Sequence, residues 1–387
     1  MGLASATCAR GPGRVVRNGS REHESRARPP PTPRPMETLM QVFQVEGDWS
    51  HENLRIGTRA DPRPGPGQVR LRMRASALNY RDLLVPKHGY GSRMQALPLI
   101  MLSDGAGIVD AIGEGVTQVA LGDRACPLFF QSWIGGEPNA ARLSRSLGCE
   151  MDGTMAEFMV LPEQGVAHVP AHLDDVEAAT LPTAAVTAWR ALVTEGRLQP
   201  GDKVLIQGTG GVSLFALQFA KMLGAYVVCT SSSNDKLARA KNLGADETIN
   251  YREITEWGRR AREIAGGEGV DHVVEVGGQG TLPQSLRAIR PGGTLSMIGV
   301  LAGSSLSASL GLVVTRHVRL QGITVGSRDD FVAMSAAIGL HRMRPVVDRV
   351  FPFEELHAAL DHLASGTHFG KICIAHGRSQ KISCDTK

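Results

Sequence analysis

The first half of the chain alternates hydrophobic and polar residues over short runs that glycine and proline interrupt. A period of two puts every second side chain on the same face of a sheet, so each run predicts a half-buried strand. The clearest runs are Gln41–Val45, Gln68–Arg74, Gly107–Ile112 and Ala156–Val160. We expect a small, irregular antiparallel barrel from Met36 to about Ala184.

From about Ala185 to Gly326 the pattern changes, and apolar strands alternate with amphipathic helices. Such alternation favours an α/β fold with a doubly wound parallel sheet, the Rossmann arrangement. The predicted strands are Val204–Gln207, Ala225–Thr230, Val270–Val276, Thr294–Val300 and Arg319–Val325. The predicted helices are Val212–Leu223, Asp235–Leu243, Ile254–Ala265 and Leu282–Ile289.

Two more helices, Asp330–Met343 and Glu354–Leu363, precede a terminal strand at Lys371–Ala375. We expect this last stretch to return and complete the first domain. The predicted division is a tail at 1–35, a catalytic domain at 36–184 completed by 327–387, and a dinucleotide-binding domain at 185–326.

A glycine-rich turn joins the first strand of the second domain to its first helix. Side chains are absent where a diphosphate would touch the backbone, and the helix N-terminus offers free N–H groups and partial positive charge. The turn comprises Gly208, Thr209, Gly210, Gly211 and Val212. An ordinary strand-turn-helix loop is the alternative for the turn alone, but its place in a βαβ unit predicts a dinucleotide site. Ser213 stands where the third glycine of the pattern belongs, and we expect it to loosen the packing of the helix.

Composition and charge limit the partners of the chain. No apolar run reaches the roughly 20 residues that a bilayer span needs, so we expect no membrane partner. Residues 1–35 carry a net charge of +5, which leaves the remainder at −1. A near-neutral body predicts no nucleic-acid partner, although the basic tail is a candidate for salt-sensitive RNA contacts.

The cysteines and the tail bear on location. Six scattered cysteines without a C-x-x-C pair, and no recognisable secretory signal, favour reduced thiols and a cytoplasmic protein. The Pro-rich tail should be disordered. Its arginines leave a mitochondrial presequence as the alternative, although the prolines interrupt any amphipathic helix.

Several segments, in their order and spacing, resemble the medium-chain dehydrogenase/reductase superfamily and, within it, the zinc-free quinone oxidoreductase and enoyl reductase branch. They are the glycine turn, Ala77–Asp82, Ser103–Gly107, Leu181–Arg190, Leu243–Asp246, Ile249–Arg252 and Gly370–Ile372. The resemblance implies a GroES-like β-barrel catalytic domain followed by a Rossmann cofactor domain, and a homodimer formed through the cofactor domains.

The same resemblance bears on metal binding. The positions that hold catalytic zinc in the superfamily's alcohol dehydrogenases correspond to Asn79, Ser103 and Thr183, and none of these side chains is a good zinc ligand. The four-cysteine structural lobe is missing too, because only Cys149 remains in its place. His88, His168 and His172 match no zinc pattern, and we expect no metal.

Without zinc to carry an alkoxide charge, reduction of a conjugated carbonyl is easier than oxidation of a simple alcohol. Such a reduction needs hydrogen-bond donors for the developing enolate and a proton source. Asn79 would place an amide in the vacated metal site, with a turn-forming role as the alternative. By resemblance, Thr187 contacts the nicotinamide and Tyr90 donates the proton. The alternatives are a hydroxyl bonded to its own helix for Thr187 and an exposed lid for Tyr90.

The second strand of the cofactor domain bears on cofactor choice. NAD-selective sites carry Asp or Glu at its end, whereas Ser231 stands there in this chain. Ser231 and Ser232 can donate to a 2′-phosphate, and Lys236 follows, with a solvated helix charge as its alternative reading. Tyr251 resembles a residue that closes over the 2′-phosphate. We therefore predict NADPH, with Arg239 or Arg252 supplying further charge.

Further nicotinamide contacts, implied by the resemblance, are Val300, Val325 and Lys371, although burial at a strand end explains the two valines equally well. The substrate pocket is expected near Tyr90, Phe129–Phe130 and Trp133. The predicted activity is zinc-independent, NADPH-dependent reduction of a small quinone, enone or enoyl substrate. The alternatives are a dehydrogenase of small alcohols and a catalytically weak NADPH-binding regulatory or RNA-binding protein.

Overall fold

The computed structural model describes residues 38–303, 305 and 308–377, together with residues 2, 11 and 13. The predictions for the tail, namely disorder and a mitochondrial presequence, therefore lie almost wholly outside the described residues. Within the described part, no helix combines the length and the hydrophobicity that crossing a membrane requires. The cytoplasmic location stays a prediction.

The first domain is built on a seven-stranded sheet in the order β15-β16-β3-β5-β6-β8, with β7 also paired to β3. Its strands up to β8 pair antiparallel, as the alternating pattern predicts. They are β3 (Gln68–Ala77), β5 (Asp104–Ile112), β6 (Arg124–Pro127), β7 (Phe158–Pro162) and β8 (Val166–His168). A smaller sheet joins β2 (Leu54–Ala60), β1 (Leu39–Val45) and β4 (Leu99–Ile100). In β3, Val69, Leu71 and Met73 are buried and the arginines between them are not, because alternate side chains face the core.

The chain returns to this sheet at its C-terminal end. Strand β16 (Lys371–Ala375) pairs antiparallel with β3, so that Cys373 faces Ala77, and β15 (Val347–Pro352) pairs parallel with β16. The sequence pattern predicted β16 but missed β15, whose residues are mostly half-exposed. This pairing supports the division into 36–184 with 327–387 and 185–326, which we keep as a proposal. The return brings residue 371 beside residues 78 and 79.

The second domain is a six-stranded parallel sheet in the order β11-β10-β9-β12-β13-β14, which confirms the predicted doubly wound fold. The strands are β9 (Lys203–Gln207), β10 (Tyr226–Ser231), β11 (Glu247–Asn250), β12 (Val270–Glu275), β13 (Ile289–Met297) and β14 (Arg319–Gly322). The pattern missed β11, and it placed the start of β13 too late because Pro291 and two glycines interrupt its apolar run.

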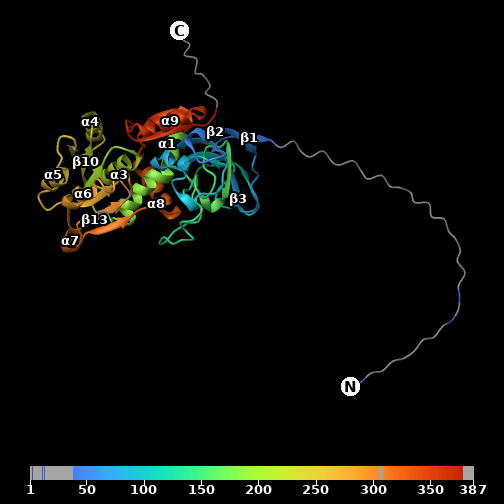
Figure 1. Cartoon of the computed structure of the whole chain (residues 1–387), viewed down its shortest axis with the longest axis horizontal. Helices are drawn as coiled ribbons and strands as arrows, with labels where there is room; N and C mark the ends of the chain where they lie inside the picture. The colour runs from blue at the N-terminus through green and yellow to red at the C-terminus, as the bar shows by residue number, and fades with distance from the viewer. Residues whose placement is uncertain are drawn as a thin grey trace, which may run out of the picture. The chain divides into compact units, whose positions relative to one another are not determined.

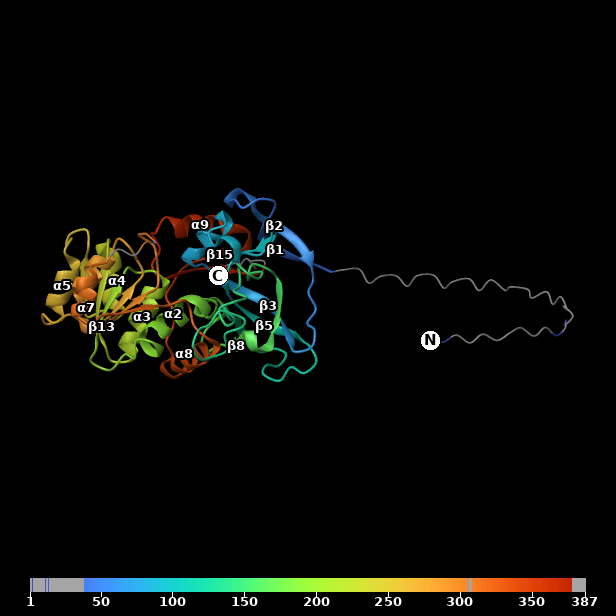
Figure 2. The same cartoon turned by 60° about the horizontal axis from the view of Figure 1, so that its bottom comes forward.

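Helices flank this sheet, as Figures 1 and 2 show on the left of each view. They are α3 (Gly211–Met222), α4 (Asn234–Asn242), α5 (Trp257–Ile264), α6 (Leu282–Ala288) and the unpredicted α7 (Leu310–Thr315). Helices α1 (Asp175–Ala179) and α2 (Val186–Trp189) lead into the sheet, and α8 (Arg328–His341) and α9 (Leu356–Ala364) lead back.

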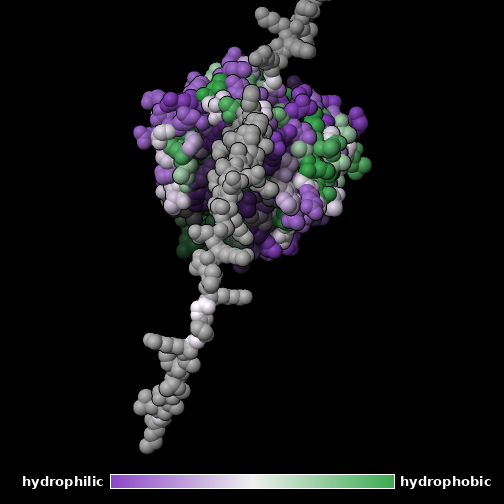
Figure 3. All heavy atoms as spheres, turned by 90° about the vertical axis from the view of Figure 1, so that its right-hand side faces the viewer, coloured by the Kyte–Doolittle hydropathy of each residue, from purple (hydrophilic) through white to green (hydrophobic). Residues whose placement is uncertain are grey.

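One hydrophobic cluster runs without a break from the barrel to the nucleotide sheet. It includes Ala77 of β3, Leu181 ahead of α2, Ile206 of β9 and Phe215 of α3. On the face seen in Figure 3, hydrophilic and hydrophobic residues are mixed over the part of the surface that the grey atoms leave visible. The two domains therefore share one hydrophobic core.

Candidate functional site

One cavity of about 570 Å³ lies where the carboxyl ends of the nucleotide-sheet strands meet the first domain. The catalytic and cofactor-binding candidates predicted from the sequence line it, except for Arg239 and Arg252. Those that line it are Asn79, Tyr90, Thr187, Gly208, Thr209, Gly210, Gly211, Val212, Ser231, Ser232, Lys236, Tyr251, Val300, Val325 and Lys371. Among the described residues, the lining also carries Arg81 and Arg93 but no Asp or Glu. The cavity therefore suits an anionic ligand.

The glycine turn forms one wall of the cavity. Gly208 has a left-handed φ of 70°, which favours glycine, and a side chain at Gly210 would project into open space. Helix α3 begins at Gly211 with Gly210 as its N-cap, and no side chain caps it. Its first N–H groups are therefore available to a diphosphate. A Cβ at Gly211 would lie 2.6 Å from Cδ of Lys371, so the closing strand also depends on this glycine.

Ser213 does not loosen helix α3, and that prediction is wrong. The residue is 3% exposed, and its hydroxyl donates to the carbonyl oxygen of Gln207 at 2.7 Å. The hydroxyl ties the first turn of the helix to the end of β9. The serine at the third glycine position is therefore accommodated where helix and strand pack closely, and its hydroxyl adds a hydrogen bond that glycine could not make.

The residues predicted to choose between cofactors lie at the end of β10, in the first turn of α4 and just after β11. Ser231 is buried at 3% exposure, and Tyr251 is 41% exposed at the rim. Lys236 is half-buried, burial lowers its pKa, and its ammonium donates to the carbonyl oxygen of Gly366 at 2.7 Å. Arg239 and Arg252 do not line the cavity, and the Arg239 guanidinium lies 3.9 Å from the Phe369 ring centroid. Lys236, in the first turn of α4, is therefore the basic side chain that lines the cavity beside the end of β10.

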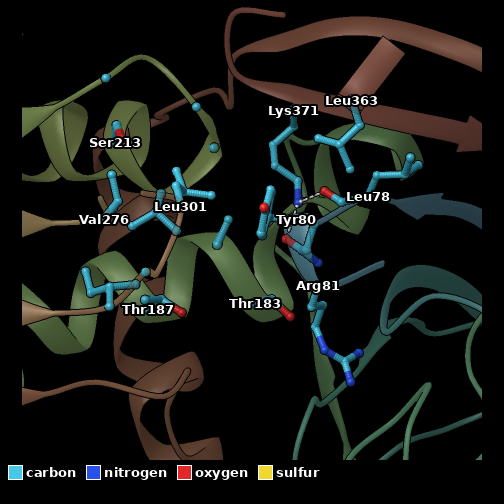
Figure 4. Close-up of a pocket in the computed structure, with 18 of the residues that line it drawn as sticks. Leu78, Tyr80, Arg81, Thr183, Thr187, Ser213, Val276, Leu301, Leu363 and Lys371 are labelled. Atoms are coloured by element: carbon cyan, nitrogen blue, oxygen red, sulfur yellow. Dashed lines mark hydrogen bonds between the residues drawn. The ribbon is translucent and has the colours of Figure 1, made fainter. Parts of the chain in front are cut away.

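A polar cluster of the buried Asp104 and Lys371 and the half-buried Asn79 and Thr183 lies at the barrel end of the cavity. The Lys371 ammonium donates to Leu78 O at 2.6 Å and to Asn79 Oδ1 at 2.7 Å, and it lies 3.4 Å from Asp104 Oδ2. Figure 4 shows Lys371 pointing toward Leu78 from above, with Thr183 and Arg81 below. Asp104 also accepts from Asn79 Nδ2 at 2.9 Å and from the Thr183 hydroxyl at 2.5 Å. Burial raises the pKa of Asp104, and the ammonium opposes that shift.

This cluster fixes the orientation of the Asn79 amide. An ammonium only donates and a carboxylate only accepts, so Oδ1 must face Lys371 and Nδ2 must face Asp104. One N–H of Nδ2 is thereby used, and among the described residues the other has no acceptor. Asn79 lines the cavity and can donate this N–H to a ligand.

The aromatic end of the cavity surrounds Arg81. Its Cζ lies 5.2 Å from the ring centroid of Tyr90 and 4.9 Å from that of Phe129. Phe129 and Phe130 line the cavity as predicted, but Trp133 does not. Trp133 is 2% exposed in the shared core, where its indole N–H donates to Gly136 O at 2.9 Å. Its prediction as a pocket residue is wrong because the segment turns inward after Phe130.

The predicted nicotinamide contacts differ in their exposure. Thr187 is 3% exposed, and no described residue, its own helix included, hydrogen-bonds to its hydroxyl. Val325 is buried, with a left-handed φ of 53°. Val300 is 49% exposed, so burial at a strand end does not explain it. All three line the same cavity.

Known proteins place this chain in a family. Residues 65–171 match the alcohol dehydrogenase GroES-like domain, and residues 211–339 match the zinc-binding dehydrogenase domain. A zinc-type alcohol dehydrogenase-like protein of Schizosaccharomyces pombe is 42% identical over 315 residues, which span 80% of this chain and 91% of the relative. The chain belongs to the medium-chain dehydrogenase/reductase superfamily.

Other members of the superfamily match over most of their length. A 2-haloacrylate reductase of a Burkholderia species is 30% identical over 84% of this chain and 93% of its own. A putative alcohol dehydrogenase of Sinorhizobium meliloti is 40% identical, with a TM-score of 0.83 and coverage of 88% and 99%. The structure of an NAD-dependent alcohol dehydrogenase is 33% identical, with a TM-score of 0.80 and coverage of 87% of this chain and 100% of its own. A crotonyl-CoA carboxylase/reductase in complex with NADP is 25% identical, with a TM-score of 0.78 and coverage of 87% of this chain and 94% of its own. The chain is an oxidoreductase of this superfamily, and the predicted GroES-like and Rossmann folds are confirmed.

The residues at the superfamily's metal positions do not fit a catalytic zinc ion. The described residues contain no group of three or more His, Cys, Asp or Glu side chains that could hold a metal. Asp104 is the carboxylate at this place, and it already accepts from three side chains. Ser103, at the second metal position, is fully buried, does not line the cavity and has an unpartnered hydroxyl. The ammonium of Lys371 is the cation that these oxygen atoms surround.

Sequence reasoning missed Asp104 and Arg81 in this superfamily member. Both stand in segments that carried the resemblance, Ser103–Gly107 and Ala77–Asp82. Within these segments only Ser103 and Asn79, the positions equivalent to zinc ligands, were considered. It also missed the hydroxyl of Thr183 as a donor. A carboxylate directly after a metal-equivalent position was the available signal, because an acidic residue in an apolar strand end needs a partner.

Asp82, which lies beside the site, makes the free energy of unfolding depend on pH. It is fully buried, accepts the Asn79 backbone N–H at 2.7 Å, and burial raises its pKa to about 6. A folded pKa above the unfolded value of about 3.9 means that the folded state binds more protons between these values, so stability falls as pH rises through this window. We expect Asp82→Asn to remove this decline. Urea unfolding of both proteins should show the free energy of the variant gaining on wild type by about 1 kcal/mol between pH 5 and pH 8. Parallel pH profiles would contradict the assignment.

Proposed function

We propose that this oxidoreductase is a zinc-independent, NADPH-dependent reductase of conjugated carbonyl compounds, such as quinones, enones or enoyl esters. The observation that carries the proposal is the Lys371 ammonium, hydrogen-bonded to Asn79 and paired with Asp104 at the superfamily's metal position. An amide and an ammonium cannot lower the pKa of an alcohol as a bound metal ion does. They can hold a donor toward an oxygen that gains charge.

The cavity supports a division of the cofactor contacts. The turn from Gly208 to Val212 binds the diphosphate, and Ser231, Ser232, Lys236 and Tyr251 bind the 2′-phosphate. Thr187, Val300, Val325 and the stem of Lys371 border the nicotinamide. When bound, the reduced nicotinamide supplies the hydride. NADPH is favoured over NADH because the described lining offers serines at the end of β10, a lysine in the first turn of α4 and no carboxylate.

The side chains of the chain itself carry the rest of the reaction. Asn79 donates its second amide N–H to the substrate carbonyl oxygen and stabilises the enolate that develops there. Asp104 and Lys371 are positioning residues, since each bonds the amide and leaves that N–H free. Tyr90 donates a proton to the α-carbon or the enolate oxygen.

The proposed function is tested by following NADPH oxidation with a panel of quinones, enones and enoyl esters, before and after dialysis against a chelator. Turnover with one of these classes that survives dialysis supports it. Turnover restricted to small alcohols with NAD, or lost on dialysis and restored by zinc, would support the alcohol dehydrogenase alternative. NADPH binding without turnover of any substrate would favour a regulatory protein, whose RNA contacts would require the tail.

Tyr90→Phe tests the proton donor. The variant keeps the ring that Arg81 covers and removes only the hydroxyl. We expect kcat to fall by about 10²-fold, the lower range for general acid catalysis, with little change in the Kd for NADPH. Stopped-flow turnover and fluorescence titration measure the two quantities. Unchanged turnover would leave Tyr90 as a lid.

The homodimer stays a proposal. Strand β14 forms the outer edge of the nucleotide sheet, and in neighbouring α7 Leu310 is 73% and Val314 62% exposed. An unpaired strand edge beside exposed apolar side chains is suited to a second copy of the chain.

A further inference from the structure

Arg81 brings a positive charge into the substrate end of the cavity. Arg81 as a whole is half-buried, and its guanidinium donates from Nη1 to Leu147 O at 3.1 Å and from Nη2 to Gly148 O at 3.5 Å. Tyr90 and Phe129 lie against it at 5.2 and 4.9 Å from Cζ. In Figure 4 the guanidinium points away from the Lys371 ammonium. Two rings and two backbone carbonyls therefore hold this group at one place.

The charge of Arg81 has no bonded counter-charge in the part of the chain that the structure describes. No carboxylate there lies within salt-bridge distance of it, whereas Arg93, which also lines the cavity, pairs with Glu150 at 3.5 Å. Asp82, the next residue, is buried and hydrogen-bonds to the Asn79 backbone instead. A half-buried cation that forms no salt bridge with the described residues favours an anion in the cavity.

The geometry of a guanidinium specifies the kind of anion. Arg81 has five N–H donors in one plane, and the protein accepts from two of them. Three donors remain, and a planar fork matches the two oxygens of a carboxylate. Asn79, two residues earlier in the chain, lines the same cavity and offers one more donor.

We propose that the substrate carries a carboxylate conjugated with its double bond, and that Arg81 binds this carboxylate. The inference rests on the proposed reductase function and names its substrate class. Hydride adds to the β-carbon, the π electrons move through the α-carbon onto the carboxylate oxygens, and a proton then bonds to the α-carbon. The alkene is reduced and the nicotinamide oxidised. The intermediate carries two negative charges, so a conjugated acid needs a fixed cation that a neutral enone does not.

Monomethyl fumarate and dimethyl fumarate are a matched pair for the test, because only the first carries a carboxylate. We expect wild type to show at least tenfold higher kcat/KM, with NADPH, for monomethyl fumarate. Arg81→Met should lower that preference at least tenfold, mainly through KM, and Arg81→Lys should retain part of it. Arg74→Met is the control, since Arg74 pairs with Asp175 and does not line the cavity, and it should leave the preference within about threefold of wild type.

Two results would overturn the inference. One is a wild-type protein whose kcat/KM is equal for dimethyl fumarate and the monoester, a result that leaves the reductase function intact. The other is an Arg81→Met variant that loses activity equally on both esters, as expected if Arg81 only anchors the loop at Leu147 and Gly148. Should that variant not fold, inhibition of wild type decides. Monomethyl succinate should inhibit at least tenfold more strongly than dimethyl succinate, and equal inhibition would also overturn the inference.

Discussion

The Asn79→Ala variant is expected to reduce a conjugated carbonyl substrate on the order of 100-fold more slowly than wild type, which is the usual effect of removing one oxyanion donor. The reason lies in the fixed amide. Lys371 and Asp104 hold Oδ1 and Nδ2 in place, so the free N–H is already oriented before the substrate binds. Steady-state kcat with saturating NADPH measures the effect, and the Kd for NADPH should stay close to wild type.

Alanine at position 79 is preferable to a change at Lys371 or Asp104. Removing one member of a buried ion pair leaves an uncompensated charge and costs about 3–5 kcal/mol of stability, which would obscure catalysis. Ser103→Ala is the matched control. Ser103 also stands at a superfamily metal position, but its hydroxyl is buried outside the cavity and unpartnered, so its removal should leave kcat nearly unchanged. Equal losses in the two variants would refute the role of Asn79.

The Ser231→Asp variant is expected to bind NADPH on the order of 100-fold more weakly and to prefer NADH. A carboxylate at the end of β10 would face the 2′-phosphate, and two charges a few ångströms apart at an effective dielectric constant near 20 repel by about 3 kcal/mol. The same carboxylate would accept from the 2′-hydroxyl of NADH. Fluorescence titration with each cofactor gives both Kd values.

Ser233→Asp provides the same added charge at a place where the fold tolerates it. Ser233 is the N-cap of α4 and accepts the Lys236 backbone N–H, a role that aspartate fills equally well, and it does not line the cavity. NADPH affinity should therefore fall much less than in Ser231→Asp. If Ser231→Asp still prefers NADPH, or if Ser233→Asp is equally weakened, the assignment of the 2′-phosphate site is wrong.

Local signals predicted the elements whose physical cause is local. The glycine turn could be read from the sequence, because a strand followed by glycines and an apolar helix has few other conformations. The absent acid after β10 could be read in the same way. Strands β11 and β15 could not, since β11 has only four residues and β15 is mostly half-exposed or exposed, and both form by pairing with another strand.

The prediction for Ser213 shows the limit of such reasoning. A third glycine permits close packing of the helix on the sheet, so a serine at that position was expected to weaken this packing. In the structure the hydroxyl finds the carbonyl oxygen of Gln207, and the substitution adds a bond. A side chain's partner is a property of its surroundings, so its energetic sign cannot be taken from the residue type alone.

By itself, the sequence determined the family and the two-domain α/β architecture, and it predicted the dinucleotide turn and the lack of good zinc ligands at positions 79, 103 and 183, because each depends on residue types at fixed spacings. Only the tertiary structure decided what replaced those ligands. Strand β16 returns across almost 300 residues of chain to place Lys371 against Asn79 and Asp104, at separations of 292 and 267 residues. It also decided that Arg81 lines the same cavity, with no carboxylate of the described residues within salt-bridge distance. Contacts of this range depend on strand pairing and side-chain direction, for which a linear pattern carries no signal.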